Sequence, residues 1–331
     1  MTTRVITVYG ATGNQGRAVT VSLLKNPAFH VRALTRNPDS IASTSLAALG
    51  AEIRAANGLH SETMVKAFEG SWGVFVNLNS DDKVFQEGCH TEFDVGKTIV
   101  DAAVQAGVRH FVFSSGPSST ELTDGRIKMK AMDMKNQIEL YARRNSQFET
   151  TSFICAAWYF ENFLDMAAAP IFGGFPFTPD LDGTLIFRCP RWGGREDVPF
   201  ISISDDYGDI VHGLFLDPAR WNGARIHGCS DILSFDDLVA QFQAATGKTS
   251  RYDPIEPSWE AFETFGVPEL EDTKLMFGLT QNTGGLYFGP EPSEKNTAAT
   301  LKRATAIALG LPKERQGLIS AKEWFTNHFS T

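Results

Sequence analysis

The sequence predicts an α/β protein with a doubly wound parallel sheet, followed by a smaller α+β part. Strand-like and helix-like segments alternate through the first half, a glycine-rich turn joins the first strand to the first helix, and the alternation loosens after residue 155. Repeated strand–helix–strand units favour a parallel sheet with helices on both faces, and right-handed crossovers make the doubly wound arrangement the default. We therefore expect a Rossmann-type domain over residues 1–154 and a C-terminal region over residues 155–331.

The first strand, residues 4–9, turns into a helix through Gly10, Gly13 and Gly16. Such a turn gathers free backbone N–H groups and the positive end of a helix dipole at one point, which suits a pyrophosphate. Gly10 would make the turn, Gly13 would let the backbone approach the ligand, and Gly16 would let the helix pack against the strand. The alternative is an ordinary strand–helix turn. The other expected contacts of this turn with a dinucleotide come from Thr12, Asn14 and Gln15.

The second strand, residues 30–35, ends at Arg36. A fold that prefers NAD places Asp or Glu at about this point to hold the ribose hydroxyls. A guanidinium instead matches a phosphate in shape and charge. Arg36 therefore favours NADP(H) over NAD(H), and the alternative is a solvated arginine at a strand end.

The remaining elements follow from the same patterns. In the first half we expect strands at residues 52–56, 73–77, 110–113 and 151–154, and helices at 39–49, 61–68 with Ser61 as N-cap, 85–106 and 128–144. In the second half we expect a helix opened by Ser234 as N-cap, and helices at 259–265 and 320–329. Glycine turns within residues 265–296 indicate either a mobile lid or a fixed surface loop.

Polar side chains follow three of the predicted strands. Because ligands of doubly wound sheets lie outside the carboxyl ends of the strands, these side chains are candidate ligand contacts. Asn57, after the third strand, could pair with the edge of an adenine; Asn77, Asn79, Ser114 and Ser115, after the fourth and fifth strands, could line a nicotinamide ribose. The alternative is loop capping. A lysine of the helix at 128–144 that faces the cleft could also bond the ribose hydroxyls.

Composition narrows the classes of partner. The 331 residues carry a net charge of −9, which argues against nonspecific binding to nucleic acid. No apolar run approaches the length of a membrane-spanning helix, and the N-terminus enters the first strand directly, so we expect a cytoplasmic protein. The seven histidines and four cysteines show no ligand spacing, so we expect no metal and reduced thiols. The 25 phenylalanines suggest an apolar cleft in the second half or an ordinary core.

Six parts of the chain together carry a resemblance to a known family. They are Gly10-Ala11-Thr12-Gly13-Asn14-Gln15-Gly16, Thr35-Arg36-Asn37-Pro38, Ser114-Ser115-Gly116, Lys135 with Glu139 and Tyr141, Trp158-Tyr159-Phe160-Glu161-Asn162, and Asp206-Tyr207-Gly208-Asp209-Ile210-Val211. With these segments the chain resembles the NmrA-like branch of the atypical short-chain dehydrogenase/reductases. That resemblance implies a Rossmann domain, a small C-terminal substrate domain and NADP(H) as ligand. It also implies that Lys135 lies at the cofactor, and that Trp158, Tyr159, Phe160, Glu161 and Asn162 lie near the substrate. Lys135, Tyr159 and Glu161 are the candidate catalytic residues.

One departure from the wider superfamily bears on the chemistry. Reductases of that superfamily pair a tyrosine proton donor with a lysine four residues later. Here Ala131 precedes Lys135 at that spacing and Arg126 precedes Lys130, so the usual Tyr-x-x-x-Lys pair is absent. The third strand also ends in Ala-Asn-Gly and lacks the Asp that commonly lies near adenine.

Two functions are compatible with this pattern. The first is a reductase that transfers hydride from NADPH to a C=N or C=O group of a small molecule. Lys135 could then supply a proton, a cationic iminium would need none, and Glu161 could stabilise its charge. The second is a non-catalytic regulator that binds NADP(H) and reports its redox state to a protein partner. The aromatic run from Trp158 to Phe177 favours the enzyme, although core packing would also explain Tyr159 and Phe160. The chain could act as a monomer or a homodimer.

Overall fold

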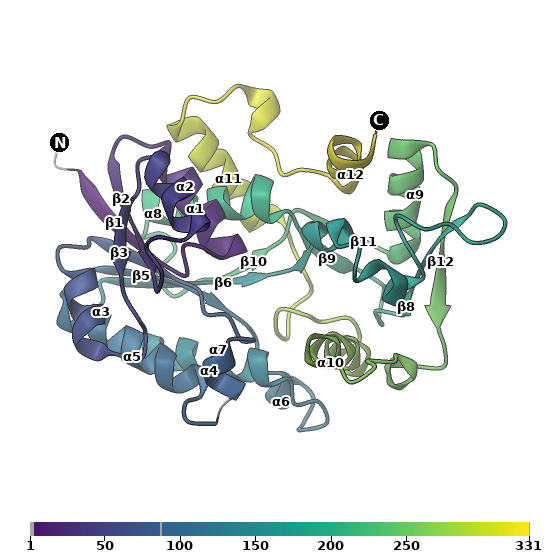
Figure 1. Cartoon of the computed structure of the whole chain (residues 1–331), viewed down its shortest axis with the longest axis horizontal. Helices are drawn as coiled ribbons and strands as arrows, with labels where there is room; N and C mark the ends of the chain where they lie inside the picture. The colour runs from purple at the N-terminus through teal and green to yellow at the C-terminus, as the bar shows by residue number, and fades with distance from the viewer. Residues whose placement is uncertain (1–2, 87, 331) are drawn as a thin grey trace.

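A seven-stranded parallel sheet forms the centre of the computed structural model, which describes residues 3–86 and 88–330 (Figure 1). Its strand order is β10-β6-β5-β4-β1-β2-β3, so the order reverses between β1 and β4. The doubly wound parallel sheet predicted from the sequence is confirmed. The strands are β1 (Arg4–Tyr9), β2 (Phe29–Thr35), β3 (Glu52–Ala55), β4 (Gly73–Val76), β5 (His110–Ser115), β6 (Thr150–Ala156) and β10 (Arg225–Gly228).

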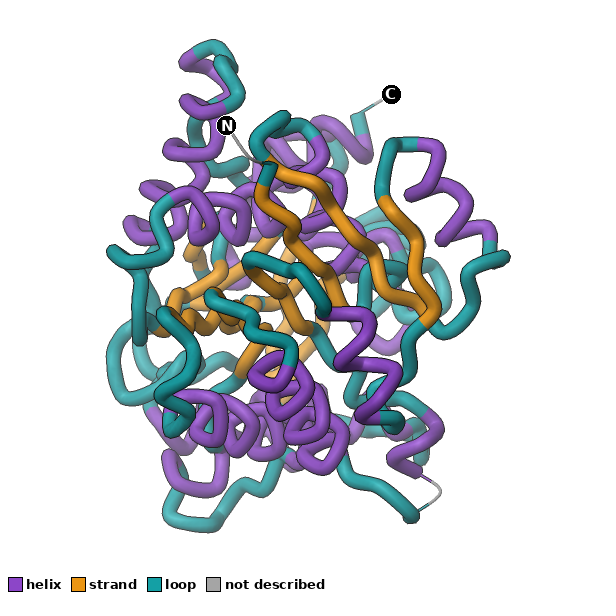
Figure 2. Tube along the Cα trace, turned by 90° about the vertical axis from the view of Figure 1, so that its left-hand side faces the viewer, coloured by secondary structure: helices purple, strands orange, loops and turns teal. Residues whose placement is uncertain are grey.

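Helices cover both faces of this sheet (Figure 2). Side chains alternate between the faces, so that Phe75 of β4 joins one apolar cluster while Val74 and Val76 join the other. The first face carries α1 (Asn14–Leu24), α2 (Ile41–Ala48), α8 (Gly208–Leu216) and α11 (Asn296–Ala308), and the second carries α3 (Ser61–Phe68), α5 (Glu92–Gln105) and α7 (Lys130–Arg143). Two short helices, α4 (Lys83–Gln86) and α6 (Ser119–Leu122), lie in the connections.

The remainder of the second half forms a smaller α+β part around an aromatic core. Trp158, Phe187, Phe200 and Phe235 pack ring against ring at its centre, so many of the phenylalanines that suggested a cleft build a core instead. The strands of this part are β7 (Trp158–Tyr159), β9 (Val198–Ile201) and β11 (Asp231–Leu233) in one sheet and β8 (Leu185–Pro190) and β12 (Ser250–Ile255) in another. Its helical segments are η1 (Phe160–Leu164), η2 (Ala169–Phe172), η3 (Ile203–Tyr207), α9 (Phe235–Thr246), η4 (Trp259–Ala261), α10 (Pro268–Thr283), η5 (Lys313–Arg315) and α12 (Ala321–Phe329).

Several predicted helix boundaries were wrong. The helix expected over 85–106 begins at Glu92, because Thr91 and Asp94 cap it reciprocally and Gly88 adopts a positive φ; residue 87 of that expectation lies outside the described residues. Ser61 is the first residue of α3 rather than its N-cap, which is His60. The helix expected over 259–265 is one short turn. The cap at Ser234 is confirmed by its hydrogen bond to the first turn of α9. The helix expected over 320–329 is α12, which begins at Ala321 because Ser320 is its N-cap.

The segment 265–296 contains regular structure that its glycine turns did not predict. It contains the sixteen-residue helix α10, and Phe277 and Phe288 are fully buried. Strand β10, which comes from beyond the boundary expected at residue 154, pairs with β6 and completes the large sheet. Along the described ranges 3–86 and 88–330, no helix combines the length and the apolar character needed to cross a membrane.

Candidate active site

The glycine turn after β1 is shaped by close backbone contacts. Gly10 has a φ of 78°, and a Cβ there would lie 2.5 Å from the carbonyl oxygen of Asn77. A Cβ at Gly16 would overlap the carbonyl of Gly10, so α1 packs directly on the turn. At Gly13, by contrast, a Cβ would meet nothing closer than 3.5 Å. Packing therefore requires Gly10 and Gly16, whereas Gly13 faces space that a ligand can enter.

The N-terminus of α1 fits the phosphates of a dinucleotide. Gly13 is its N-cap and supplies no side-chain acceptor, so the first-turn N–H groups have no capping side chain. Gln15, 7% exposed, has a buried Oε1 with no hydrogen-bond partner in the described chain. A buried acceptor without a donor is costly unless a bound molecule supplies one. Both features indicate that this end of α1 takes a ligand.

A pocket of about 250 Å³ opens where the strand order reverses. Arg36 lies at its edge and pairs with Asp82 at 2.7 Å, with 61% of the arginine side chain exposed. This pocket, named here the switch-point pocket, brings together several residues predicted as cofactor contacts. Its lining includes Gly10, Thr12, Gly13, Arg36, Asn57, Asn77 and Asn79, together with Leu34, Leu59 and Phe85.

Lys135 reaches from α7 to the loop after β4. Its Nζ donates to the carbonyl of Leu78 at 3.1 Å and to Ser80 Oγ at 2.9 Å, and forms an ion pair with buried Glu92. All three donors of the ammonium are thus engaged. Lys135 fixes the loop that carries Asn77 and Asn79.

Ser114 and Ser115 lie at the end of β5, where they were expected, and both are buried. The Ser115 hydroxyl donates to Glu139 at 2.5 Å, and the same carboxylate pairs with Arg143 and Arg225. Neither serine lines the switch-point pocket. In this arrangement Ser115 supports a buried ionic cluster that joins β5, α7 and β10.

A second pocket of about 330 Å³ lies beside β7. It is named here the aromatic pocket, because the rings of Trp158, Tyr159, Phe172 and Tyr287 line it. The Tyr159 hydroxyl accepts a hydrogen bond from Gln15 Nε2 at 2.6 Å, and burial raises the pKa of Tyr159, so this hydroxyl stays protonated at neutral pH. Its remaining lining residues are Ala157, Asn162, Asp165, Ala168, Leu270, Thr273 and Met276.

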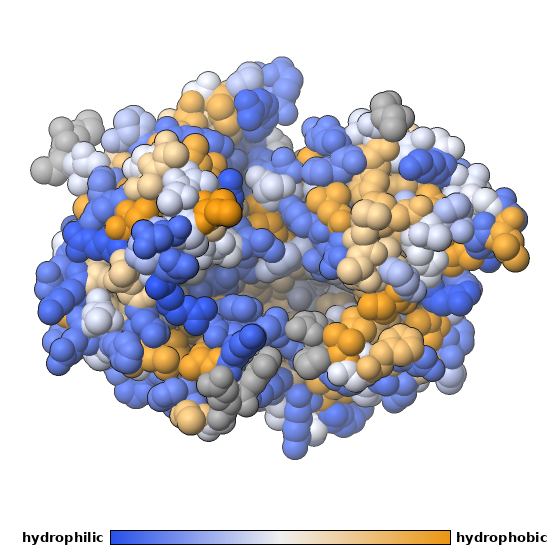
Figure 3. Space-filling view, viewed as in Figure 1, coloured by the Kyte–Doolittle hydropathy of each residue, from blue (hydrophilic) through white to orange (hydrophobic). Residues whose placement is uncertain are grey.

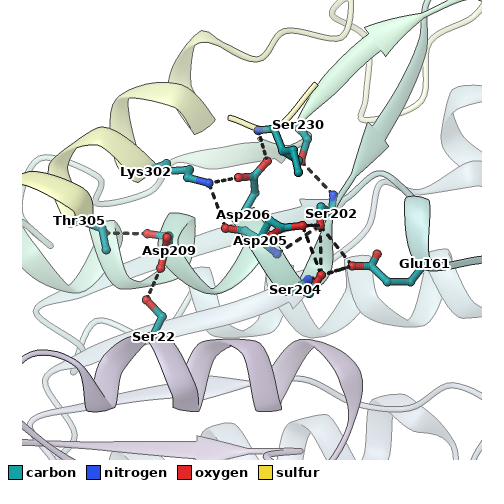
Figure 4. A network of polar contacts seen from close by, with 11 residues as sticks. Ser22, Glu161, Ser202, Ser204, Asp205, Asp206, Asp209, Ser230, Lys302 and Thr305 are labelled. Carbon is teal, nitrogen blue, oxygen red and sulfur yellow. Dashed lines mark hydrogen bonds and ion pairs between the residues drawn. The ribbon is translucent and has the colours of Figure 1, made fainter. Parts of the chain in front are cut away.

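Two residues predicted near the substrate have other roles in the structure. Phe160 is fully buried, stacked between Phe200 and Trp324, so core packing, the alternative left open for it, is what the structure shows. Glu161 does not line the aromatic pocket; its carboxylate accepts from the backbone N–H groups of Ile203 and Ser204 at the start of η3. Figure 4 shows its contact with Ser204. Glu161 lines a separate pocket between α1 and the η3–α8 segment, together with Asn14. Asp165, rather than Glu161, is the carboxylate residue of the aromatic pocket.

The comparisons with known proteins agree with this architecture. The model of the NmrA-like family matches residues 2–305. Over 328 residues the chain is 72% identical to the NmrA-like family domain-containing oxidoreductase hkm9 of Aspergillus hancockii, covering 99% of this chain and 98% of that relative. The chain belongs to the NmrA-like family.

Solved structures confirm the fold of this NmrA-like chain. NmrA, a negative transcriptional regulator crystallised in complex with NADP, superposes with a TM-score of 0.74 at 23% identity, covering 99% of this chain and 96% of that chain. An NADPH-dependent quinone oxidoreductase from Escherichia coli, complexed with NADPH, gives a TM-score of 0.67 at 20% identity, covering 98% and 100%. At these identities the similarity establishes the fold.

Sequence reasoning missed three parts of this site. Asp82, the partner of Arg36, follows a loop with no strand or helix signal. Leu270 and Met276 belong to α10, which was expected to be a loop or lid. Tyr287 joins the aromatic pocket from a loop far along the chain.

The molecular surface is hollowed between the sheet domain and the C-terminal part on the face that Figure 3 shows. Within residues 3–86 and 88–330, no cluster of three His, Cys, Asp or Glu side chains could hold a metal ion.

Proposed function

We propose that this NmrA-like chain is an NADP(H)-dependent oxidoreductase that reduces a C=N or C=O group of a small molecule held in the aromatic pocket. One observation carries the proposal: the Gln15–Tyr159 hydrogen bond joins the glycine turn of the switch-point pocket to the aromatic pocket. A dinucleotide site and an apolar substrate site must adjoin for hydride transfer. The oxidoreductase name of the 72% identical relative supports the same class.

Different residues around the glycine turn would bind different parts of NADP(H). The α1 N-terminus at Gly13 would hold the pyrophosphate, and Arg36 would exchange Asp82 for the 2′-phosphate. Asn57 would meet the adenine edge, and Lys135 would keep the loop bearing Asn77 and Asn79 against the ribose. The bound dinucleotide supplies the hydride.

A C=N substrate suits the aromatic pocket better than a C=O substrate. Rings such as Trp158 and Tyr287 attract cations through their π faces, and Asp165 adds a carboxylate to the same lining. A cationic iminium, already positive at the reacting carbon, accepts hydride without a proton in the same step. An iminium therefore places fewer demands on a site that lacks the Tyr-x-x-x-Lys pair.

The first experiment combines calorimetric titration with NADPH, NADP, NADH and NAD and stopped-flow hydride transfer to cyclic imines, their N-methyl iminium forms and ketones. We expect NADPH to bind more tightly than NADH, and at least one C=N compound to oxidise it. Failure of NADPH to bind would overturn the proposal. Equal binding of the oxidised and reduced forms with no turnover of the panel would favour the redox-sensing regulator instead.

A further inference from the structure

The Gln15 side chain has an unusual position for a residue in a nucleotide-binding turn. It lies in the first turn of α1, yet its amide turns inward to the Tyr159 hydroxyl, 144 residues away in sequence. Gln15 Nε2 donates this 2.6 Å bond, and Gln15 Oε1 stays buried without a partner. The close packing of Gly16 on Gly10 fixes the backbone from which the amide projects.

The direction of this bond decides what Tyr159 can do. A phenol that accepts a hydrogen bond keeps its own proton available to a third group. Tyr159 lines the aromatic pocket, so that proton can point at a molecule bound there. The same N–H would stabilise the phenolate left after the proton has gone, which is the requirement for an efficient acid.

Three other candidate acids are already engaged in hydrogen bonds. The Lys135 ammonium is held by Leu78, Ser80 and Glu92. The Tyr287 hydroxyl donates to the carbonyl of Ala156 at 3.4 Å. The Asp165 carboxylate accepts from the backbone N–H groups of Ala167 and Ala168.

We propose that Gln15 is a positioning residue that holds the Tyr159 hydroxyl as the proton donor to the substrate, in place of the missing Tyr of Tyr-x-x-x-Lys. This inference rests on the proposed function. Hydride from NADPH adds to the carbon of a neutral C=N, the Tyr159 O–H bond breaks, an N–H bond forms, and water reprotonates the phenolate while NADP leaves oxidised.

The test compares two probes with the same ring system: dihydroisoquinoline, at a pH where it is unprotonated, and N-methyl dihydroisoquinolinium, which needs no proton. Single-turnover hydride transfer is measured at saturating NADPH. We expect Gln15→Leu and Tyr159→Phe each to slow reduction of the neutral imine by about tenfold or more, and that of the N-methyl iminium by less than about twofold. Gln15→Leu should add little in a Tyr159→Phe background. Equal slowing of both probes would show a merely structural role and overturn the inference.

A second readout needs no substrate. The Raman ring doublet of tyrosine reports whether its hydroxyl accepts or donates a hydrogen bond, and the difference spectrum against Tyr159→Phe isolates Tyr159. Gln15→Leu should shift that doublet away from the acceptor state, whereas the exposed control Gln147→Leu should not. An unchanged doublet would contradict the inference. If the wild type reduces neither probe, the proposed function fails, and the Raman result still decides whether Gln15 donates to Tyr159.

Discussion

Arg36 is the charged residue of the switch-point pocket that we expect to bind the 2′-phosphate. In its ion pair with Asp82 the Arg36 side chain is 61% exposed, so solvent screens the pair and a phosphate can replace Asp82 at little cost. A guanidinium–phosphate pair is bidentate and roughly twice as strong as a neutral hydrogen bond. The selectivity for NADPH over NADH should therefore reside largely in this one residue.

Replacing Arg36 tests that selectivity. Arg36→Glu should raise the Kd of NADPH by roughly ten- to a hundredfold, as expected for loss of a charge-assisted contact and gain of repulsion, and change that of NADH by less than about threefold. Calorimetric titration measures both constants. Arg303→Glu, on the exposed side of α11, makes the same charge change away from the pocket and should leave both constants unaltered. Equal losses for the two cofactors would remove Arg36 from the 2′-phosphate site.

Helix α8 packs closely against a neighbouring helix, away from the glycine turn. It lies between α1 and α11, and a Cβ at Gly213 would come within 2.5 Å of the carbonyl oxygen of Leu301. The glycine thus permits a backbone-to-backbone contact of α8 with α11.

Gly213→Ala should lower the free energy of unfolding by about 1–3 kcal/mol, because the two helices must separate. Helix propensity alone would give the opposite sign, since Ala is the better helix former. Urea midpoints measure the difference. Gly317→Ala is the matched control, because its Cβ would meet nothing within 4 Å. A stabilised Gly213→Ala would contradict the close contact.

Elements encoded by nearby residues could be predicted, and those that depend on distant partners could not. Strands β1 to β6 and the cap at Ser234 follow from local patterns. The strands of the C-terminal part pair with segments far along the chain, and their sequences show no regular alternation.

The same division holds for the candidate site. The glycine turn and Arg36 could be located from spacing alone, and the structure places them in one pocket. The link from Gln15 to Tyr159 and the contribution of Tyr287 to the aromatic pocket depend on tertiary packing. For Glu161 the family resemblance implied a position near the substrate, whereas the structure shows its carboxylate accepting from N–H groups of η3.

At the scale of the whole molecule, one buried ion pair connects distant segments. Asp206 of η3 is fully buried, pairs with Lys302 of α11 and accepts from the backbone N–H of Ile319 at 3.1 Å (Figure 4). Burial raises the pKa of Asp206, and Lys302 opposes that rise. The C-terminal segment is therefore tied to the sheet domain through a carboxylate that depends on its partner.

Lys302→Met should destabilise the chain by about 3–5 kcal/mol, because it leaves a buried carboxylate without its counter-charge. The double change Lys302→Met with Asp206→Asn should recover part of that loss, since the amide carries no charge and can still accept from Ile319. Chemical unfolding of the wild type, the two single variants Lys302→Met and Asp206→Asn, and the double variant gives the coupling free energy. Additive losses in the double variant would show that the pair is not coupled.

The position of β10 has a consequence for how the chain is made. Strand β6 ends at Ala156, but its outer neighbour begins only at Arg225. On the ribosome, N-terminal segments fold first. The outer edge of β6 therefore has no hydrogen-bonding partner until the residues between β6 and the end of β10 have been synthesised. An open, apolar strand edge is a template for pairing with other chains. A nascent chain stalled in this interval, or a fragment cut at residue 154, would therefore be prone to aggregation until β10 closes the edge.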